Sequence, residues 1–422
     1  MTVDRVLLGD VVDFQTGFPF RSKDYSSDGS GLRLLRGDNI AQGYLRWESA
    51  KLWPEPLSPD LEKFQLQEHD VVLAMDRPWI EAGLKYSALS LDDLPALLVQ
   101  RVARLRGTTA LDGRFLRYLI GSADFTEHVH NISTGTAVPH ISGRDILSFE
   151  FELPPIAEQR EIAAILGALD DKIELNRKTA ATLEAMARAL YRSWFVDFDP
   201  VRAKAEGRAP AHMDAATAAL FPDRFGDDGL PEGWEWSEVG NELVIMDAQR
   251  IPLSKSQRAE KKGSVPYYGA TSVMDFVDQA LFNEELLLLG EDGSVVTTEG
   301  KPFTQYIWGP SWVNNHAHVL KGKRFSIGQL KCFFDQVEIA PFVNGAVQAK
   351  LNQGNMKKIP YMKAGDPIHA AFDEFLVVWF ARIRAAHDEI KNLAALRDAL
   401  LPRLMSGELR VGEAREQVEA VA

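Results

Sequence analysis

The chain of 422 residues contains a single cysteine, Cys332, so no disulfide can form within it. This excludes a small secreted fold held by disulfides and fits a reducing compartment. No segment approaches the roughly 18 uninterrupted apolar residues of a membrane span. The first ten residues include Asp4 and lack an apolar core, unlike a signal peptide. We therefore expect a cytoplasmic protein with no membrane partner.

Positive charge is also scarce. Lys and Arg number 47 against 60 Asp and Glu, which gives a formal net charge of −13. This balance does not favour nucleic acid as a partner, but it does not exclude one, because binding depends on local patches. Hydrophobic residues make up 45% and charged residues 25%, as is typical of a folded protein. The length suits two or three domains of roughly 150 residues each.

Motifs of enzyme chemistry are absent as well. The nearest approach to a phosphate-binding loop, residues 293–302, has six residues between its glycines and Pro302 where a magnesium-binding Ser or Thr is needed. The sequence has no H-E-x-x-H and no C-x-x-C motif for a metal. Residues 153–156 (LPPI) lack the polar and aromatic residues with which amino-methyltransferases hold a flipped base. The sequence therefore favours a binding protein and predicts no catalytic or metal site.

Two long stretches of the chain repeat one another. Ile162 aligns with Phe372 at an offset of 210 positions (372 − 162), and the register continues along both helical stretches. Further upstream, residues 70–75 (DVVLAM) align with residues 285–290 (ELLLLG) at an offset of 215 (285 − 70). The changing offset indicates loop deletions in the second copy. The sequence thus predicts two copies of one unit, each a globular module followed by a long helix.

These repeats define an α+β protein with two duplicated α/β modules separated by two long helices. Pro155 suits a first helical turn, and Asp366 with Pro367 suits an N-cap and first position. We expect modules at 1–153 and 234–365, helices at 154–198 and 366–408, a connector at 199–233 and a tail at 409–422.

Each predicted helix carries an apolar stripe with alternating spacings of three and four residues, which is typical of a coiled-coil seam. A helix of about 40 residues is roughly 60 Å long and cannot bury this stripe inside one small module. We therefore expect the helices to pack as an antiparallel coiled coil around a pseudo-twofold axis. Asn176 in the first seam either fixes its register as a buried amide or is solvated. The coiled-coil and partner-docking candidates are Ile162, Leu169, Ile173, Asn176, Leu183, Leu190, Trp194, Phe195, Phe372, Trp379, Ile383, Ile390, Leu393 and Leu400.

Four segments together resemble one known family over essentially the whole chain. Residues 153–208 (LPPIAEQREIAAILGALDDKIELNRKTAATLEAMARALYRSWFVDFDPVRAKAEGR) resemble a central conserved region, and residues 400–411 (LLPRLMSGELRV) resemble the end of a distal one. Residues 6–14 (VLLGDVVDF) and 231–242 (PEGWEWSEVGNE) resemble the openings of two recognition domains. The family is that of the specificity subunits of type I restriction–modification enzymes.

The resemblance implies a subunit of a phage-defence complex that binds double-stranded DNA and carries no catalytic residues. Each module is then a target recognition domain that reads one half of an asymmetric, bipartite site. The helices set the spacer and dock two methyltransferase subunits, which methylate adenine N6. Motor-nuclease subunits join them for ATP-dependent restriction. S-adenosylmethionine, ATP and magnesium are used by these partner subunits, and no cofactor is bound by this chain.

DNA contacts are expected from basic and amide side chains and from glycines on loops. For residues 36–39 a simple turn is an equally open interpretation, and for Arg77 an ion pair with Asp76 or Glu81. The positive cluster at 255–262 is either a phosphate patch or a solvated loop. In module 1 the candidates are Arg36, Gly37, Asn39, Arg77, Thr134, Gly135, Thr136 and His140. In module 2 they are Lys255, Arg258, Lys261, Lys262, Asn344, Gly345, Gln348, Lys350 and Asn352.

Other interpretations stay open from the sequence alone. Trp194 and Phe195, at the end of the first helix, either pack against a module or form a docking face for the methyltransferase. The chain could itself be a nuclease or methyltransferase, or a helical scaffold whose modules bind protein. It could also be a spare specificity subunit that is not expressed.

Overall fold

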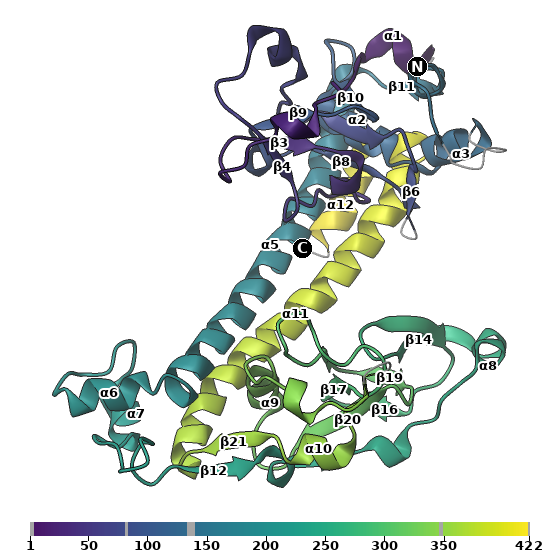
Figure 1. The fold of residues 1–422 in the computed structure, drawn as a ribbon. Coiled ribbons are helices and arrows are strands. Elements are labelled where there is room, and N and C mark those ends of the chain that lie inside the picture. The colour runs from purple at the N-terminus through teal and green to yellow at the C-terminus, as the bar shows by residue number, and fades with distance from the viewer. Residues whose placement is uncertain (1–3, 81–82, 133–139, 346–348, 421–422) are drawn as a thin grey trace. The chain divides into compact units, whose positions relative to one another are not determined.

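The computed structural model describes residues 4–80, 83–132, 140–345 and 349–420 (Figure 1). The chain divides into two compact units. Unit 1 comprises Met1–Glu174 and Ile390–Ala422, and unit 2 comprises Leu175–Glu389. Each unit therefore contains one module together with parts of both long helices. Within the described ranges, no helix is long and apolar enough to cross a membrane.

The module of unit 1 is built around a sheet whose central strand is completely buried. In strand β5 (Val71–Ala74), Val71 and Leu73 face one core, whereas Val72 and Ala74 face another. Both faces are covered, which explains why this strand is a continuous apolar run. The order of the sheet is β2 (Asp13–Thr16), β10 (Val102–Arg106), β5 and β8 (Tyr86–Ala88).

Smaller elements complete this module. Strand β1 (Asp4–Leu7) pairs with β11 (Glu150–Leu153), which joins the beginning of the module to its end. The remaining strands are β3 (Leu32–Leu35), β4 (Lys51–Trp53), β6 (Trp79–Ile80), β7 (Gly83–Leu84) and β9 (Ala96–Leu98). The helices are α1 (Leu8–Val11), α2 (Gly113–Ile120), α3 (Ala123–Ile132) and α4 (Gly143–Leu147).

The module of unit 2 repeats this topology. Its sheet order, β13–β20–β17–β18, matches β2–β10–β5–β8 strand for strand, and the parallel pair β14·β19 matches the parallel pair β3·β9. The buried central strand is again divided between two cores. The strands are β12 (Glu235–Glu238), β13 (Leu243–Ile245), β14 (Lys262–Tyr268), β15 (Val273–Val277), β16 (Phe282–Asn283), β17 (Leu286–Gly290), β18 (Thr304–Ile307), β19 (Pro310–Val313), β20 (Ala317–Gly322) and β21 (Pro360–Lys363). The helices are α8 (Lys255–Glu260), α9 (Ile327–Phe334) and α10 (Gln353–Lys357).

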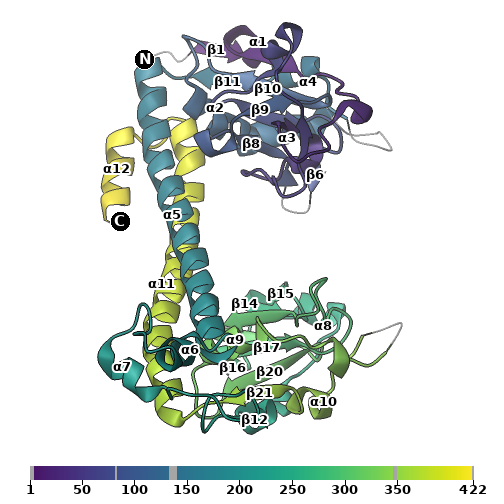
Figure 2. The ribbon, with the colours of Figure 1, turned by 60° about the vertical axis from the view of Figure 1, so that its left-hand side comes forward.

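The two long helices, α5 (Ile156–Phe195) and α11 (Asp366–Met405), pack on each other. In unit 1 the first part of α5 meets the last part of α11, where Arg397 donates a 2.8 Å hydrogen bond to Asp170. In unit 2 the last part of α5 meets the first part of α11 (Figure 2). There the ring centroids of Trp194 and Phe372 are 5.5 Å apart. The helices therefore run antiparallel, and the predicted α+β fold class is confirmed.

Asn176 is a buried polar residue in the seam between the two helices. Its side chain is fully buried in unit 2, and its Oδ1 accepts a 3.3 Å hydrogen bond from Arg382. The solvated alternative is therefore wrong. Most of the predicted seam is buried, while Leu183, Leu190, Trp379 and Ile390 are half-buried.

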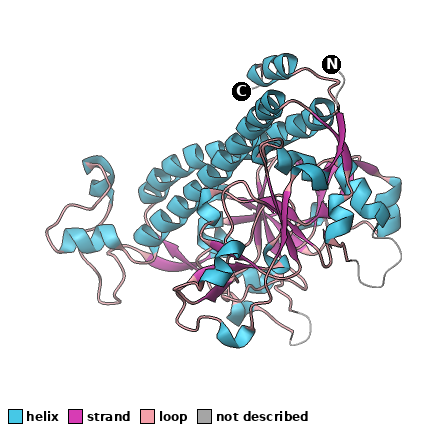
Figure 3. Ribbon diagram, turned by 90° about the horizontal axis from the view of Figure 1, so that it is seen from above, coloured by secondary structure: helices cyan, strands magenta, loops and turns pink. Residues whose placement is uncertain are grey.

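The segments expected to be a connector and a tail also contain helices. Helices α6 (Asp199–Ala205) and α7 (Ala215–Leu220) lie in the first of them, and α12 (Val411–Glu419) in the second. Val201 joins the core of unit 2, and Ala414 joins a core of unit 1. Both segments therefore contribute buried apolar surface. Figure 3 shows the helices of the chain in cyan.

Candidate functional site

Three segments of module 1 meet at one edge of its central sheet. The N–H of Met75, just after β5, donates to the carbonyl of Arg101 at 2.9 Å. The N–H of Ile141 donates to the carbonyl of Met75, also at 2.9 Å. Asp76 and His140 then form an isolated β-bridge. The predicted DNA-contact residue His140 is thereby fixed beside the end of the central strand.

The Asp76 carboxylate organises this edge. One of its oxygens pairs with Arg101 at 2.9 Å, and the other bonds His140 Nδ1. Arg101 has a left-handed backbone with φ of 65°, which turns the chain into β10. Both partners remain largely exposed, so the edge presents a guanidinium and an imidazole of fixed position. The predicted contacts Thr134, Gly135 and Thr136 lie outside the described residues.

The loop that contains Arg36, Gly37 and Asn39 is held by its own amide. Asn39 accepts from the N–H of Arg36 at 3.0 Å, donates to the carbonyl of Arg46 at 2.9 Å, and is buried. Its polar atoms are therefore used to shape the loop, and its role as a DNA contact stays a prediction. Arg36 pairs with the exposed Asp38 at 3.2 Å.

Arg77 follows this edge with φ of 46° and is exposed. Among the described residues Asp76 pairs with Arg101 and His140 and not with Arg77. Glu81, the other partner considered for Arg77, lies outside the described residues. Arg77 therefore stays a candidate contact beside the Asp76 edge.

Module 2 builds the same edge from different residues. The N–H of Glu291 donates to the carbonyl of His316, and the N–H of Leu351 donates to the carbonyl of Glu291, both at 2.9 Å. Asp292 and Lys350 form the isolated bridge. The triad corresponding to Asp76, Arg101 and His140 is therefore Asp292, His316 and Lys350.

This register corrects the sequence alignment of the central strands. Ala74 pairs with Val102 in module 1, and Gly290 pairs with Ala317 in module 2. Ala74 therefore corresponds to Gly290, and Met75 to Glu291. The offset at this strand is 216 (290 − 74) rather than 215, because a run of consecutive leucines gave no signal of register.

A buried ion-pair network supports the edge of module 2. His318 is fully buried, and its Nδ1 lies 2.6 Å from Asp247 while its Nε2 lies 2.7 Å from the carbonyl of Leu351. Gln353 donates to the same aspartate at 2.6 Å. Burial opposes ionisation, but hydrogen bonds from His318 and from the N–H of Val319 lower the pKa of Asp247 overall. The network thus anchors the segment that follows Lys350 to the sheet.

Asp247, Glu291 and His318 have ligand atoms within 4.8 Å of one another, a spacing that could hold a metal ion. However, Arg250 bonds Glu291 at 2.7 Å, and both ring nitrogens of His318 already face protein oxygens. The Arg250 guanidinium therefore already provides the positive charge that these carboxylates need. We infer that the cluster holds the segment around Leu351 in place and does not bind a metal ion.

The other loop predicted in module 2 closes as a short hairpin. Asn344 and Lys350 exchange backbone hydrogen bonds of 2.9 and 2.8 Å, and Gly345 has the left-handed φ of 91° that favours glycine. Gln348 lies outside the described residues. Asn352 is the N-cap of α10 and accepts from the N–H of Asn355 at 2.8 Å. Its side-chain oxygen is therefore occupied, and Lys350 is the exposed cation of this loop.

The predicted positive cluster at 255–262 is smaller than expected. Arg258 is only 14% exposed, because it pairs with Asp275 at 2.9 Å and lies over the ring of Tyr267. Arg258 therefore adds little exposed charge to this cluster, and its role as a DNA contact stays a prediction. Lys255 and Lys262 are exposed, and Lys261 is half-buried.

The aromatic residues at the end of α5 are interior residues. Trp194 contacts Phe221 with ring centroids 5.0 Å apart, and Phe195 stacks on His369 at 4.9 Å. Both are buried in unit 2, so neither can form an exposed docking face. Their packing role is the one that the structure supports.

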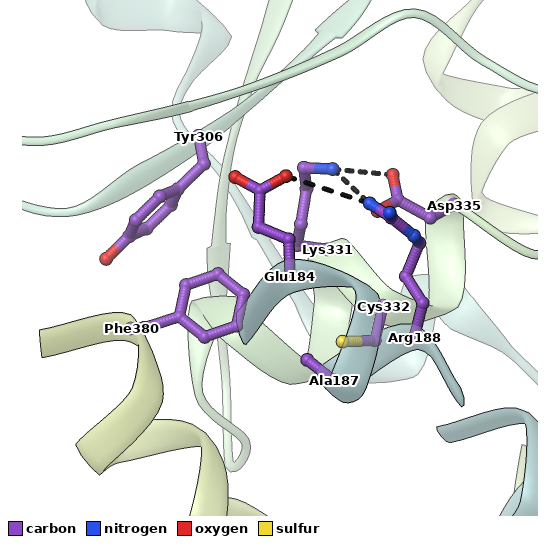
Figure 4. A pocket seen from close by; sticks show the side chains of 8 residues that line it. All are labelled: Glu184, Ala187, Arg188, Tyr306, Lys331, Cys332, Asp335 and Phe380. Atoms are coloured by element: carbon purple, nitrogen blue, oxygen red, sulfur yellow. Dashed lines mark hydrogen bonds and ion pairs between the residues drawn. The ribbon is translucent and has the colours of Figure 1, made fainter. Parts of the chain in front are cut away.

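Unit 2 also contains a small pocket lined by Glu184, Ala187, Arg188, Tyr306, Lys331, Cys332, Asp335 and Phe380 (Figure 4). Its volume is about 10 Å³, close to the least that holds one water molecule. Lys331 pairs with Asp335 at 2.6 Å, and burial raises the pKa of the Cys332 thiol. A protonated thiol beside a closed ion pair is unreactive, so this pocket is not a second site.

Sequence reasoning missed Lys85 and Arg250, which lie at or beneath these edges. Neither stands in a motif, and Lys85 occupies a strand region with the pattern of a core. Only the strand pairing could have brought them to notice.

Comparisons with known proteins agree with this arrangement. Residues 3–185 match the family described as "Type I restriction modification DNA specificity domain". The chain is 36% identical over 174 residues to the type I restriction enzyme EcoAI specificity subunit of Escherichia coli, covering 40% of this chain and 28% of that protein. It is 33% identical over 180 residues to the type I restriction enzyme MjaVIII specificity subunit of Methanocaldococcus jannaschii, covering 42% of each. The matches thus span less than half of these relatives.

A solved structure gives the fold over nearly the full length. The type I restriction–modification system S subunit from M. genitalium aligns with a TM-score of 0.54 at 14% identity, covering 96% of both chains. The sequence match to this family thus covers residues 3–185, and the likeness of fold to the solved S subunit extends over nearly the whole chain.

Proposed function

We propose that this chain is the non-catalytic DNA-reading subunit of a type I restriction–modification complex, and that each module reads one half of an asymmetric, bipartite site. One observation carries the proposal. The two modules share a topology but present different side chains at corresponding positions, with Arg101 and His140 in one and His316 and Lys350 in the other. A repeated scaffold with different edges suits the reading of two different base sequences.

The long helices would set the distance between the two half-sites. Base identity is read mainly in the major groove, and two readers on one face of DNA are separated by about one helical turn, roughly 10 bp. The bases between them would form a nonspecific gap. The paired helices α5 and α11, with Asn176 in their seam, suit a spacer of defined register.

The partners proposed are two methyltransferase subunits and the motor-nuclease subunits, which would supply S-adenosylmethionine, ATP and magnesium chemistry. The net charge of −13 suggests weak DNA binding by the chain alone, with the methyltransferase completing the clamp. Since most of the seam residues are buried, docking needs other positions as well. Val377 and Val378 on α11, which are 60% and 65% exposed, are suitable apolar candidates.

The test is a map of N6-methyladenine in the host genome with and without this chain. We expect one asymmetric, gapped motif to lose its methylation when the chain is deleted. Loss of only one half of the specificity after altering one module would connect that module to its half-site. An unchanged map on deletion of an expressed chain would contradict the proposal.

A further inference from the structure

Lys85 is a largely buried lysine in module 1 that has no role in the function proposed for this chain. The residue lies just before β8 and is 8% exposed. Its backbone is fully engaged, since its N–H donates to the carbonyl of Pro78 at 2.7 Å and its carbonyl accepts from Ala74 at 3.0 Å. Within the described ranges, no hydrogen bond or ion pair of its ammonium group is found. A lysine that is more than nine-tenths buried, and whose ammonium has no bonded acceptor among the described residues, is costly to a fold, so a ligand is a natural explanation.

The charges around Lys85 are mainly positive. Its ammonium interacts with the charges of Arg46, Arg77 and Asp38. Burial lowers the pKa of Lys85, Asp38 opposes this shift, and Arg46 and Arg77 add to it. Asp38 is itself paired with Arg36 and largely exposed to solvent. The group of Arg46, Arg77 and Lys85, here named the Lys85 cluster, therefore has excess positive charge among the described residues.

The loop of residues 36–46 lies close to the Lys85 ammonium and is held by its own hydrogen bonds. Asn39 ties Arg36 to Arg46 through its two backbone hydrogen bonds. The N–H of Gly43 donates to the carbonyl of Tyr86 at 2.8 Å, which fixes the loop against β8. A Cβ on Gly37 would lie 4.0 Å from the Lys85 ammonium. Glycine at this position leaves the ammonium open to a ligand that approaches over the loop.

The fold itself does not need this cation. In module 2 the N–H of Gly290 donates to the carbonyl of Phe303 at 3.0 Å, just as Ala74 donates to Lys85. Phe303 therefore stands in the position of Lys85, and a hydrophobic side chain suffices there. Module 1 thus has an ammonium where its duplicate has a benzyl group, at the same edge as Asp76.

We propose that the Lys85 cluster binds an acceptor oxygen of DNA, and that Lys85 is a specificity-determining or anchoring residue of module 1. The shared chemistry is that of a backbone phosphate oxygen or of guanine O6 in the major groove. This inference rests on the proposed DNA-reading function and adds to it a named residue and ligand atom type. DNA would supply an acceptor for the Lys85 ammonium that the described residues do not provide.

The experiment measures DNA binding by the full chain assembled with its methyltransferase subunits. The duplexes carry the motif from the methylation map, or single-base changes in either half. The variants are Lys85→Met, which keeps the length of the side chain, and Arg77→Gly, which suits the left-handed backbone at that position. The matched control is Lys51→Met, because Lys51 is an exposed lysine of the same module. Salt dependence and the melting temperature Tm of the free chain are measured for each.

We expect Lys85→Met to weaken binding by about ten- to hundredfold, the usual effect of losing a hydrogen bond to a charged group. Its Tm should equal or exceed that of the unaltered chain, because an unpaired buried charge has been removed. Arg77→Gly should weaken binding without changing Tm, and Lys51→Met should change neither. A salt slope reduced by about 0.9 identifies a phosphate contact. An unchanged slope with relaxed preference at one guanine of the first half-site identifies a base contact.

Two results would overturn the inference. One is binding by Lys85→Met and Arg77→Gly that equals that of Lys51→Met. The other is a lower Tm for Lys85→Met with Arg77→Gly binding normally, because Lys85 would then have a structural role. Failure of the unaltered complex to select any duplex would instead contradict the proposed function, and so the two failures are distinguishable.

Discussion

The two modules use one topology but hold their reading edges in different ways. In module 1 an exposed pair, Arg101 and His140, is tied by Asp76 at the surface. In module 2 the anchor lies beneath the surface, where His318 and Asp247 form part of a buried network. The positions of His318 and Asp247 correspond to Ala103 and Thr16 in module 1. The comparison teaches that a duplicated scaffold tolerates replacement of an uncharged pair by an ionic network at the same place.

The largest effect is expected when the buried His318–Asp247 network of module 2 is disrupted. His318→Ala would leave a cavity and remove one hydrogen-bond partner of the buried Asp247, which keeps Arg250, Gln353 and the N–H of Val319. The cavity and the weakened network together should cost roughly 3–5 kcal/mol of stability. Calorimetry and hydrogen exchange should show unit 2 losing stability while unit 1 keeps its own. Thr16→Ala in module 1 is the matched control and should cost little. Equal loss in both units would contradict the assignment of the network to module 2.

A second comparison concerns the first turns of the two long helices. His369 in α11 and Gln159 in α5 occupy corresponding positions (369 − 210), and both are buried. Gln159 bonds the carbonyls of Ala110 and Pro154 at 2.9 and 2.8 Å. His369 accepts from the N–H of Ala364 at 3.2 Å and packs against Phe195 and Phe325. Burial lowers the pKa of His369 from 6.5 to about 4. One unit therefore has a titratable group where the other has none.

This difference predicts a pH dependence confined to unit 2. Because the folded pKa is lowered, the unfolded chain takes up the proton first, so stability is lost as pH falls from 6.5 towards 4. A shift from 6.5 to about 4 corresponds to about 3 kcal/mol lost at the acid end. Denaturant unfolding between pH 4 and 7 measures it. His369→Gln, which copies unit 1, should flatten this dependence, and a persistent dependence in that variant would assign it to other groups.

A smaller effect is expected on recognition when Asp76 is altered. Asp76→Ala releases Arg101 and His140, and we expect about tenfold weaker discrimination at the first half-site, in the range of one base contact. Competition binding with single-base variants of the site measures this. Discrimination at the second half-site should stay unchanged, and a loss at both halves would argue against independent modules.

The smallest effect concerns the seam of the helices. Asn176 and Ala386 correspond (386 − 176 = 210), and both are buried, but only Asn176 brings an amide into the seam, where its Nδ2 has no hydrogen-bond partner among the described residues. Asn176→Leu should raise the free energy of unfolding by about 1 kcal/mol, because a desolvated polar group is removed. Ala386→Ser is the converse control and should lower it. A loss of stability in Asn176→Leu would mean that the hydrogen bond from Arg382 outweighs the desolvation.

The long-range organisation was predictable, since it depends on periodicity and repetition. The stripe from Ile162 to Trp194 extends over so many turns that the helix and its pairing could be inferred without coordinates. The sheet edges were harder to predict from the sequence, because the roles of their residues depend on partners that are distant along the chain. Asn39 and Arg258 have the residue types expected of DNA contacts. In the structure, however, Asn39 shapes a loop, and Arg258 pairs with Asp275 over the ring of Tyr267. Conversely, Lys85 resembles an ordinary strand residue in the sequence, and only the structure shows that its ammonium has no bonded acceptor among the described residues.

The division of the chain into units has a consequence for its synthesis. Unit 2 is continuous from Leu175 to Glu389, but unit 1 needs both its first 174 residues and the segment from Ile390 onwards. Leu393, Leu400 and Leu404 complete a core that begins with Leu8. On the ribosome, the module translated first must therefore wait, with part of its apolar surface uncovered, until the whole of the other unit has been made. A nascent chain paused before residue 390 should bind chaperones through unit 1 and release them once the last stretch of α11 has emerged.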